Sequence, residues 1–188
     1  MTYRFIVGLL TLLFFSTAHA ENFSYRYLDI VKQDAELDLG GGLNADGDLF
    51  GIAGSLPVND TVFLQGLYAE GDVENVIDIE GWEISIGAHF PLNETTDIVI
   101  DLTHSETELS FGGFSETADG ESLQLGFRTK LDQKLEVFAN YWADLDDSST
   151  AISIGGLVKL TPTVALGLGY DNGDDYEVTT IALRMYLD

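Results

Sequence analysis

The 188-residue sequence lacks cysteine entirely and holds only eight lysine and arginine residues. Without cysteine the chain can form neither a disulfide scaffold nor a lipoprotein-type acylated cysteine. The few basic residues stand against 32 acidic ones, which gives a formal net charge of −24. Phosphate binding needs clustered Lys and Arg, so this balance excludes a nucleic-acid partner.

Long apolar runs are also missing after residue 20, so no later segment reads as a membrane-spanning helix. The first twenty residues have the three parts of a secretory signal: the charged Arg4, the apolar core Phe5–Phe15 and the small-residue stretch Ala18-His19-Ala20. The core is shorter than the roughly 20 residues with which a helix crosses a bilayer, which disfavours the alternative of an uncleaved anchor. We therefore expect a signal peptide over residues 1–20 and a single domain over residues 21–188.

The rest of the chain alternates apolar and polar side chains with a period of two, which is typical of β-strands that have one apolar face. Trp82, Ile84 and Ile86 share one face of such a segment, and Glu83 and Ser85 share the other. The alternation predicts ten strands, with eight as the alternative count. Their expected ranges are Phe23–Lys32, Asp48–Leu56, Thr61–Glu70, Gly81–Phe90, Asp97–Ser105, Glu121–Leu131, Leu135–Asp144, Ala151–Leu160, Thr163–Asp171 and Glu177–Leu187.

Four of the connections between these strands are short and contain proline, asparagine or aspartate, around Pro57, Pro91, Asp132 and Pro162. The other connections are predicted as longer acidic loops over residues 33–47, 71–80, 106–120, 145–150 and 172–176. Short turns at one end and longer loops at the other are typical of a membrane-spanning β-barrel with its loops outside the cell. A soluble β-protein alternates as well, with its apolar face inward. Glycine and hydroxyl groups on the polar face, with aromatics near the strand ends, favour the barrel.

This architecture and the repeated turns resemble the small outer-membrane β-barrel proteins of Gram-negative bacteria, the broad OmpA/OmpX-like porin superfamily. The resemblance implies an all-β, antiparallel, up-and-down transmembrane β-barrel in the cell outer membrane. It also implies insertion by the outer-membrane assembly machinery, which commonly reads an aromatic C-terminal residue. This chain departs from that pattern, because it ends in Tyr186-Leu187-Asp188.

Charged residues on the polar face predict a charge cluster in the lumen. The lumen itself is expected to be narrow, because ten strands enclose little more than the space that side chains fill in an eight-stranded barrel. Five bulky residues are expected to point inward with the cluster, whereas inward glycines are expected to leave gaps for a narrow solute path. The first strand is interpreted with Tyr25, Tyr27 and Asp29 outward, and Arg26 inward with Lys159. The predicted cluster is Glu83, Asp101, Arg128, Lys130, Glu136 and Arg184, and the bulky residues are Phe63, Leu67, Phe138, Trp142 and Leu157.

The two histidines after the signal do not suggest catalysis. Asp101, Thr103 and Ser105 surround His104 in sequence, but a strand points them to the opposite face from His104. We expect no catalytic residues, metal or cofactor, and a non-enzymatic outer-membrane barrel with a structural or surface-interaction role. The alternatives are a narrow porin-like channel and a soluble periplasmic β-protein. The acidic rim favours outer-membrane lipid as a partner, including lipopolysaccharide bridged by divalent cations.

Overall fold

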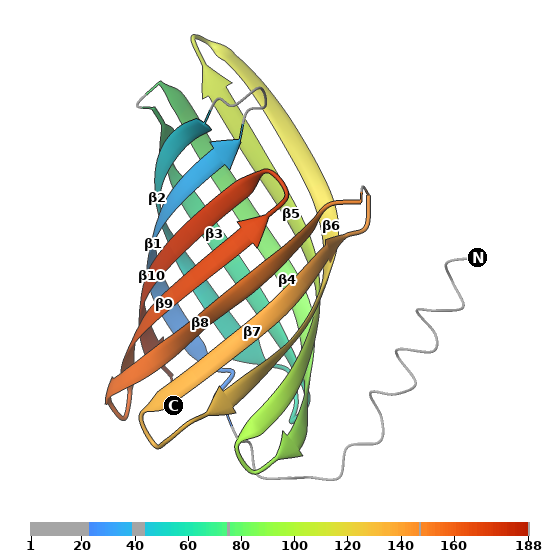
Figure 1. The fold of residues 1–188 in the computed structure, drawn as a ribbon, viewed down its shortest axis with the longest axis vertical. Coiled ribbons are helices and arrows are strands. Elements are labelled where there is room, and N and C mark those ends of the chain that lie inside the picture. The colour runs from blue at the N-terminus through green and yellow to red at the C-terminus, as the bar shows by residue number, and fades with distance from the viewer. Residues whose placement is uncertain (1–22, 39–43, 75, 147, 188) are drawn as a thin grey trace, which may run out of the picture.

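Ten antiparallel strands form one closed barrel in the computed structural model, which describes residues 23–38, 44–74, 76–146 and 148–187 (Figure 1). The predicted signal peptide, residues 1–20, lies outside the described residues. Each strand pairs with its neighbours in sequence, so the topology is up-and-down. The strands are β1 (Tyr27–Asp38), β2 (Asn44–Pro57), β3 (Val62–Val73), β4 (Ile77–Asn93), β5 (Thr96–Phe111), β6 (Phe114–Lys130), β7 (Leu135–Asp144), β8 (Thr150–Thr161), β9 (Val164–Gly173) and β10 (Tyr176–Tyr186).

The barrel closes where β1 meets β10, in an unbroken antiparallel register from Tyr27 opposite Tyr186 to Leu37 opposite Tyr176. This closure confirms ten strands rather than eight. It also satisfies the backbone hydrogen bonds of both terminal strands, so the sheet has no open edge. None of the described residues forms a helix long and apolar enough to cross a membrane.

A side-chain oxygen holds each of the four short turns, which lie together at one end of the barrel (Figure 1). Asn59 Oδ1 accepts hydrogen bonds from the backbone N–H groups of Thr61 and Val62, at 2.8 and 2.9 Å. Asp132 Oδ1 accepts from Lys134 and Leu135, at 2.6 and 2.7 Å. Such Asx turns are the reason that Asn and Asp recur at these positions. We call this end of the barrel the short-turn end.

At the opposite end, which we call the hairpin end, the predicted long loops are wrong in extent. Strand pairing continues through most of residues 106–120, because β5 and β6 pair as far as Phe111 and Phe114. Gly112 and Gly113 alone make the turn, both with positive φ (58° and 88°). A Gly-Gly pair between strands is a hairpin signal in itself. It was hidden because Glu and Ser on both faces of the projecting hairpin interrupt the apolar alternation.

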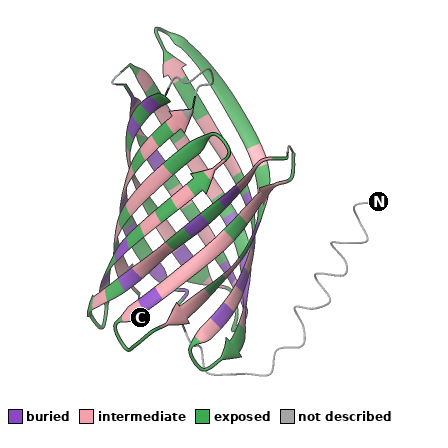
Figure 2. Ribbon diagram, in the orientation of Figure 1, coloured by how far each residue is buried: buried purple, intermediate pink, exposed green. Residues whose placement is uncertain are grey.

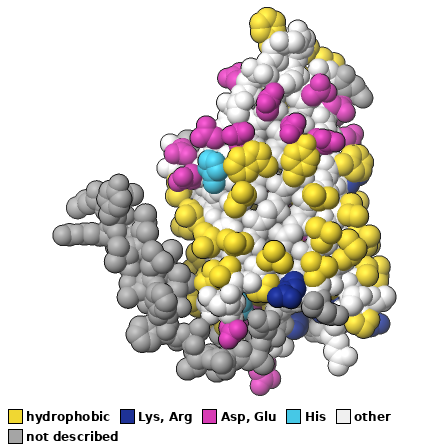
Figure 3. Space-filling view, turned by 180° about the vertical axis from the view of Figure 1, so that it is seen from behind, with side chains coloured by type: hydrophobic (Ala, Val, Ile, Leu, Met, Phe, Trp, Pro, Cys, Tyr) yellow, Lys and Arg dark blue, Asp and Glu magenta, His cyan; other side chains and the backbone are white. Residues whose placement is uncertain are grey.

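The outer wall is apolar, and the interior mixes polar and charged side chains with aromatic and apolar ones, unlike a soluble β-protein with an apolar core and a polar surface (Figures 2 and 3). Ile84, Leu125 and Leu168 on the outer wall are 58%, 54% and 60% exposed. Asp101 and Thr103 alternate with exposed Leu102 and His104 along β5 and are buried, as predicted. The first strand has the opposite phase from the prediction. Tyr25, Tyr27 and Asp29 are buried inside, whereas Arg26 is exposed.

The turn at Asp132 yields a pH-dependent prediction. Its two backbone hydrogen bonds hold the pKa of the Asp132 carboxyl below its usual value. The stability that it contributes is therefore complete above the unfolded-state pKa of about 4 and disappears as the pH falls through the lower folded pKa. Asp132→Ala should lower the urea midpoint of the refolded barrel at about pH 7, and this deficit should shrink at about pH 2.

Asn59→Ala is the matched control, because it removes an acceptor of the same geometry that does not titrate. Its deficit should be the same at both pH values. Equal deficits for Asp132→Ala at the two pH values would show that the carboxylate charge does not contribute to this turn.

Candidate functional site

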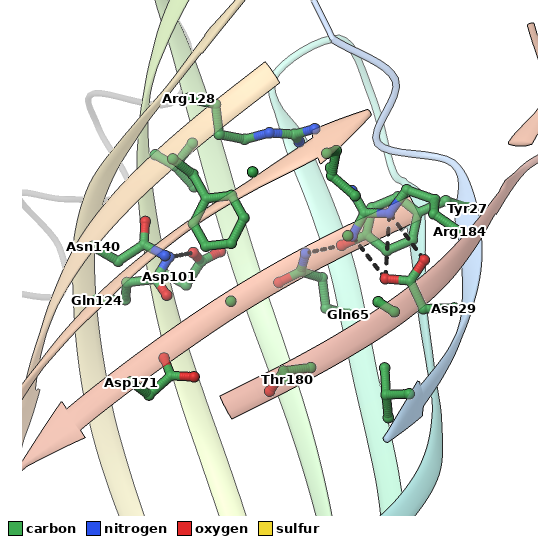
Figure 4. Close-up of a pocket in the computed structure, with 18 of the residues that line it drawn as sticks. Tyr27, Asp29, Gln65, Asp101, Gln124, Arg128, Asn140, Asp171, Thr180 and Arg184 are labelled. Carbon is green, nitrogen blue, oxygen red and sulfur yellow. Dashed lines mark hydrogen bonds and ion pairs between the residues drawn. The ribbon is translucent and has the colours of Figure 1, made fainter. Parts of the chain in front are cut away.

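The interior of the barrel is the candidate site, because residues of eight strands (β1, β3 and β5 to β10) line a cavity there (Figure 4). One buried ion pair lies across the seam between β1 and β10, where Asp29 and Arg184 are direct cross-strand partners. Arg184 Nε donates to Asp29 Oδ1 at 2.9 Å and Arg184 Nη2 donates to Oδ2 at 2.7 Å. The guanidinium carbon lies 3.5 Å from the centroid of the Tyr27 ring. The pair is therefore bidentate and stacked, an arrangement that arginine forms and lysine does not.

A second buried ion pair joins β6 and β7. Arg128 Nε donates to Glu136 Oε1 at 2.9 Å, and Arg128 Nη2 donates to the same oxygen. The guanidinium carbon lies 4.8 Å from the ring centroids of both Phe23 and Tyr25. Lys130 Nζ lies 4.9 Å from the Phe23 centroid, so it faces the same aromatic group.

Tyr25 links this second pair to a polar network on β4 and β5. Its hydroxyl donates to Asp97 Oδ2 at 3.3 Å, and His89 Nδ1 lies 3.1 Å from the same oxygen. The Tyr25 ring stacks on His89 and on Phe63, with centroids 4.2 and 4.5 Å apart. Ion pairs and stacked rings thus fill the lumen near the short-turn end. We call this group the plug; it comprises Phe23, Tyr25, Tyr27, Asp29, Phe63, His89, Asp97, Arg128, Lys130, Glu136 and Arg184.

Three inward glycines make room for bulky side chains. A Cβ at Gly87 would lie 2.3 Å from the Phe63 ring, and one at Gly155 would lie 2.4 Å from the Phe138 ring. A Cβ at Gly126 would lie 2.0 Å from Asn140 Oδ1. The expectation that these glycines leave a solute path is therefore wrong at these positions. Instead, they let side chains from the neighbouring strand lie flat against the wall of the barrel.

Beyond the plug the lumen contains two cavities that follow one another towards the hairpin end. The inner cavity, of about 290 Å³, lies directly against the plug and is lined by Asp101, Gln124 and Asn140. The outer cavity, of about 500 Å³, is lined by Glu83, Thr103 and Tyr176. Trp142 and Asp171 line both cavities, so they mark the boundary between the two.

The predicted charge cluster is thus divided along the lumen. Arg128, Lys130, Glu136 and Arg184 lie in the plug: Arg128 pairs with Glu136, Arg184 pairs with Asp29, and Lys130 lies over the Phe23 ring. Asp101 lies in the inner cavity, where one oxygen accepts a hydrogen bond from Gln124 Nε2 at 2.5 Å. Glu83 lies in the outer cavity, away from the arginines. The five bulky residues predicted to point inward, Phe63, Leu67, Phe138, Trp142 and Leu157, all line the lumen.

No protein-family model and no curated protein matches the sequence. Among solved structures, the translocator domain of the autotransporter NalP from Neisseria meningitidis is similar, with a TM-score of 0.52 and 10% identity over 100% of this chain and 95% of that chain. The KdgM porin in complex with disordered oligogalacturonate has a TM-score of 0.50 and 5% identity, over 86% of this chain and 99% of that chain. The fold is that of the outer-membrane β-barrels. At these identities the likeness concerns the fold alone.

Sequence reasoning missed two acids of the plug, Asp29 and Asp97, and the aromatic residues around them. Tyr25 and Tyr27 were interpreted as interfacial aromatics, and this choice turned Asp29 outward with them. The signal for the correct phase was present in Leu28 and Ile30, which are apolar and point to the outer wall. The tyrosines are inside because their rings stack on guanidinium groups and His89.

The Asp29–Arg184 pair predicts a large loss of stability when only one partner is removed. Asp29→Asn leaves a buried guanidinium without its anion, so the free energy of unfolding should fall by about 3–5 kcal/mol. The double variant Asp29→Asn/Arg184→Met should recover part of this loss, since it removes the uncompensated charge. Urea unfolding of the refolded barrel, followed by tryptophan fluorescence, measures both variants.

Asp34→Asn is the control, because Asp34 pairs with Lys32 on the solvent-exposed outer wall. Exposed pairs contribute little to stability, so its midpoint should stay close to that of the wild type. A loss for Asp29→Asn no larger than for Asp34→Asn would contradict the assignment of a buried pair.

Proposed function

We propose that the protein is a non-enzymatic, integral protein of the cell outer membrane, closed to solutes at the short-turn end. Its role is then structural or one of surface interaction at the hairpin end. The plug is the observation that carries this proposal. Two bidentate or stacked arginine pairs and the Tyr25–His89–Asp97 network occupy the lumen where a channel would need to be open.

The outer wall supports placement in a membrane. Large apolar side chains that are about half exposed cover the wall between the short turns and a layer of acidic residues (Figure 3). A soluble protein rarely exposes a patch of this extent, whereas a barrel in a bilayer needs an apolar band about 25 Å tall. In the usual orientation of such barrels the short turns face the periplasm and the hairpin end faces the exterior.

The acidic layer supports contact with anionic lipid. Asp34 and Asp48 lie on the outer wall beside Lys32, whose Nζ is 2.8 Å from Asp48 Oδ1. Other exposed acids continue around the same level of the barrel (Figure 3). Divalent cations that bridge these carboxylates to lipopolysaccharide are a prediction, as is insertion by the outer-membrane assembly machinery.

A non-enzymatic role fits the surroundings of the two histidines. His89 is buried in the plug with its Nδ1 on Asp97, where it contributes to packing. His104 is on the outer wall, 5.4 Å from the Trp82 ring by centroids. Each histidine therefore has a structural environment, and the two lie on opposite faces of the wall.

Planar-bilayer recording tests closure directly. The wild-type barrel should insert without steady conductance steps, because the plug fills the lumen. The triple variant Tyr25→Ala/Arg128→Ala/Glu136→Ala removes a ring together with a paired cation and anion, so it leaves no lone charge. It should produce ohmic steps.

Lys32→Ala/Asp48→Ala is the matched control, since it removes an ion pair from the outer wall. It should stay as silent as the wild type. Steady steps from the wild type, unchanged in size by the triple variant, would contradict closure and support the narrow porin-like channel instead.

A further inference from the structure

The lumen beyond the plug has negative charge without matching positive charge. In the described part of the chain, no lysine or arginine lines the outer cavity, while four aspartates and one glutamate do. Both arginines that reach the inner cavity are already paired, with Asp29 and Glu136. The acids that face the two cavities are Glu83, Asp101, Asp144, Asp171, Asp174 and Asp175.

Each cavity has a lining residue with a buried polar atom that has no hydrogen-bond partner. Asp101 Oδ1 is one, in a residue that is 3% exposed, and Thr103 Oγ1 is the other, in a residue that is 4% exposed. The two residues are neighbours on the inward face of β5, so they lie roughly 7 Å apart along the strand. Buried polar atoms without a partner are rare in folded proteins, because burying such an atom unpaired is unfavourable. A ligand that donates hydrogen bonds would satisfy both.

The boundary between the cavities adds an aromatic wall, with acids in the cavities on both sides of it. Trp142 Nε1 donates to Ser153 Oγ at 2.8 Å, and Ser153 Oγ in turn donates to Asp171. This chain of bonds fixes the indole where it lines both cavities. Glu83 and Asp171 both line the outer cavity, and no lysine or arginine among the described residues lines it with them. Aromatic rings beside carboxylates are the usual surroundings of a bound ammonium group.

We infer that these two cavities bind a linear aliphatic amine that carries two or more positive charges. Its ammonium groups donate to Asp101 in the inner cavity, to Asp171 at the boundary, and to Thr103 and Glu83 in the outer cavity. Tyr176 and Asp174 line the outer cavity through which the ligand enters. The entry from the cell exterior rests on the proposed membrane orientation, whereas the binding itself does not.

Two observations favour a linear organic cation over an inorganic one. Among the described residues, no three His, Asp or Glu side chains are grouped closely enough to hold a metal ion. The carboxylates are instead spread along the depth of the lumen, which suits charges spread along a flexible chain (Figure 4). The cavities, of about 290 and 500 Å³, are also in the size range of small-molecule sites.

Trp142 provides an internal reporter, because the chain has only two tryptophans and Trp82 lies on the β4 wall near Glu106 and His104. In a Trp82→Phe background the fluorescence of the refolded barrel comes from Trp142 alone. Titration with spermidine, in zwitterionic detergent at moderate salt, should give a saturable change. Asp101→Asn/Asp171→Asn should raise the Kd at least tenfold.

Asp119→Asn/Glu116→Gln is the matched control, because it removes the same charge from the exposed part of the β5–β6 hairpin. Its Kd should stay within twofold of the parent. Heat-dependent migration on gels establishes that each variant is folded before the titration. Both lumen substitutions keep the shape of the side chain and remove charge from an acidic region, so folding is expected to persist.

Three results would overturn the inference. These are a linear, non-saturating response to spermidine, an equal weakening in the hairpin control, and an equally tight response to Mg²⁺. A conducting wild-type barrel that still binds spermidine would overturn only the proposed closure. A silent barrel that does not respond to spermidine would overturn only this inference.

Discussion

The ion pair between Asp29 and Arg184 connects the first and last strands of the barrel, and the arrangement of the lumen depends on it. Charges inside a barrel have lost much of their hydration, so an arginine remains there only with an anion and further contacts. Asp29 supplies the anion, and the Tyr27 ring supplies a stacking surface. Arg128 repeats the arrangement with Glu136 and Tyr25. Because both pairs lie towards the short-turn end, that end is filled.

The filled end makes the two ends of the lumen differ in charge. The basic residues of the interior are gathered at or near the plug, where acids and aromatic rings offset them. Beyond it, acids line the outer cavity, and no lysine or arginine of the described residues does. The glycines of the inner wall contribute to both halves, since they let Phe63, Phe138 and Asn140 lie close to the wall. The proposed function follows from this arrangement, as a barrel closed at one end and acidic towards the other.

Much of the fold could be predicted from the sequence, because alternation over a bilayer-spanning strand has one physical cause: one face contacts lipid and the other faces the lumen. Leu123 and Leu125 must face outward if Gln124 is to face the lumen, and the structure has them so. The prediction was wrong where that cause is absent. Residues 106–120 project beyond the apolar band, where Glu106, Glu108 and Ser110 take the outer-face positions of β5, so strand pairing continues without an apolar outer face.

The site could be predicted only in part for a related reason. Alternation tells which face a residue occupies, so Asp101, Arg128 and Glu136 were placed inside correctly. It does not tell at what depth two residues from distant strands meet. Glu83 and Arg128 were therefore grouped although the barrel places them in separate regions. The tyrosines of the first strand show a further limit, because an aromatic ring suits a lipid interface and a guanidinium group equally well.

One-sided labelling of a single cysteine tests most directly whether the lumen is open at the hairpin end and closed at the short-turn end. The chain has no cysteine, so Thr180→Cys places a unique thiol on the wall of the inner cavity (Figure 4). Gln133→Cys, on a short turn, reports which side of a vesicle that end faces. A membrane-impermeant thiol reagent should reach Cys at position 180 only from the side opposite to position 133. Labelling of both positions from the same side would contradict a plug that closes the short-turn end.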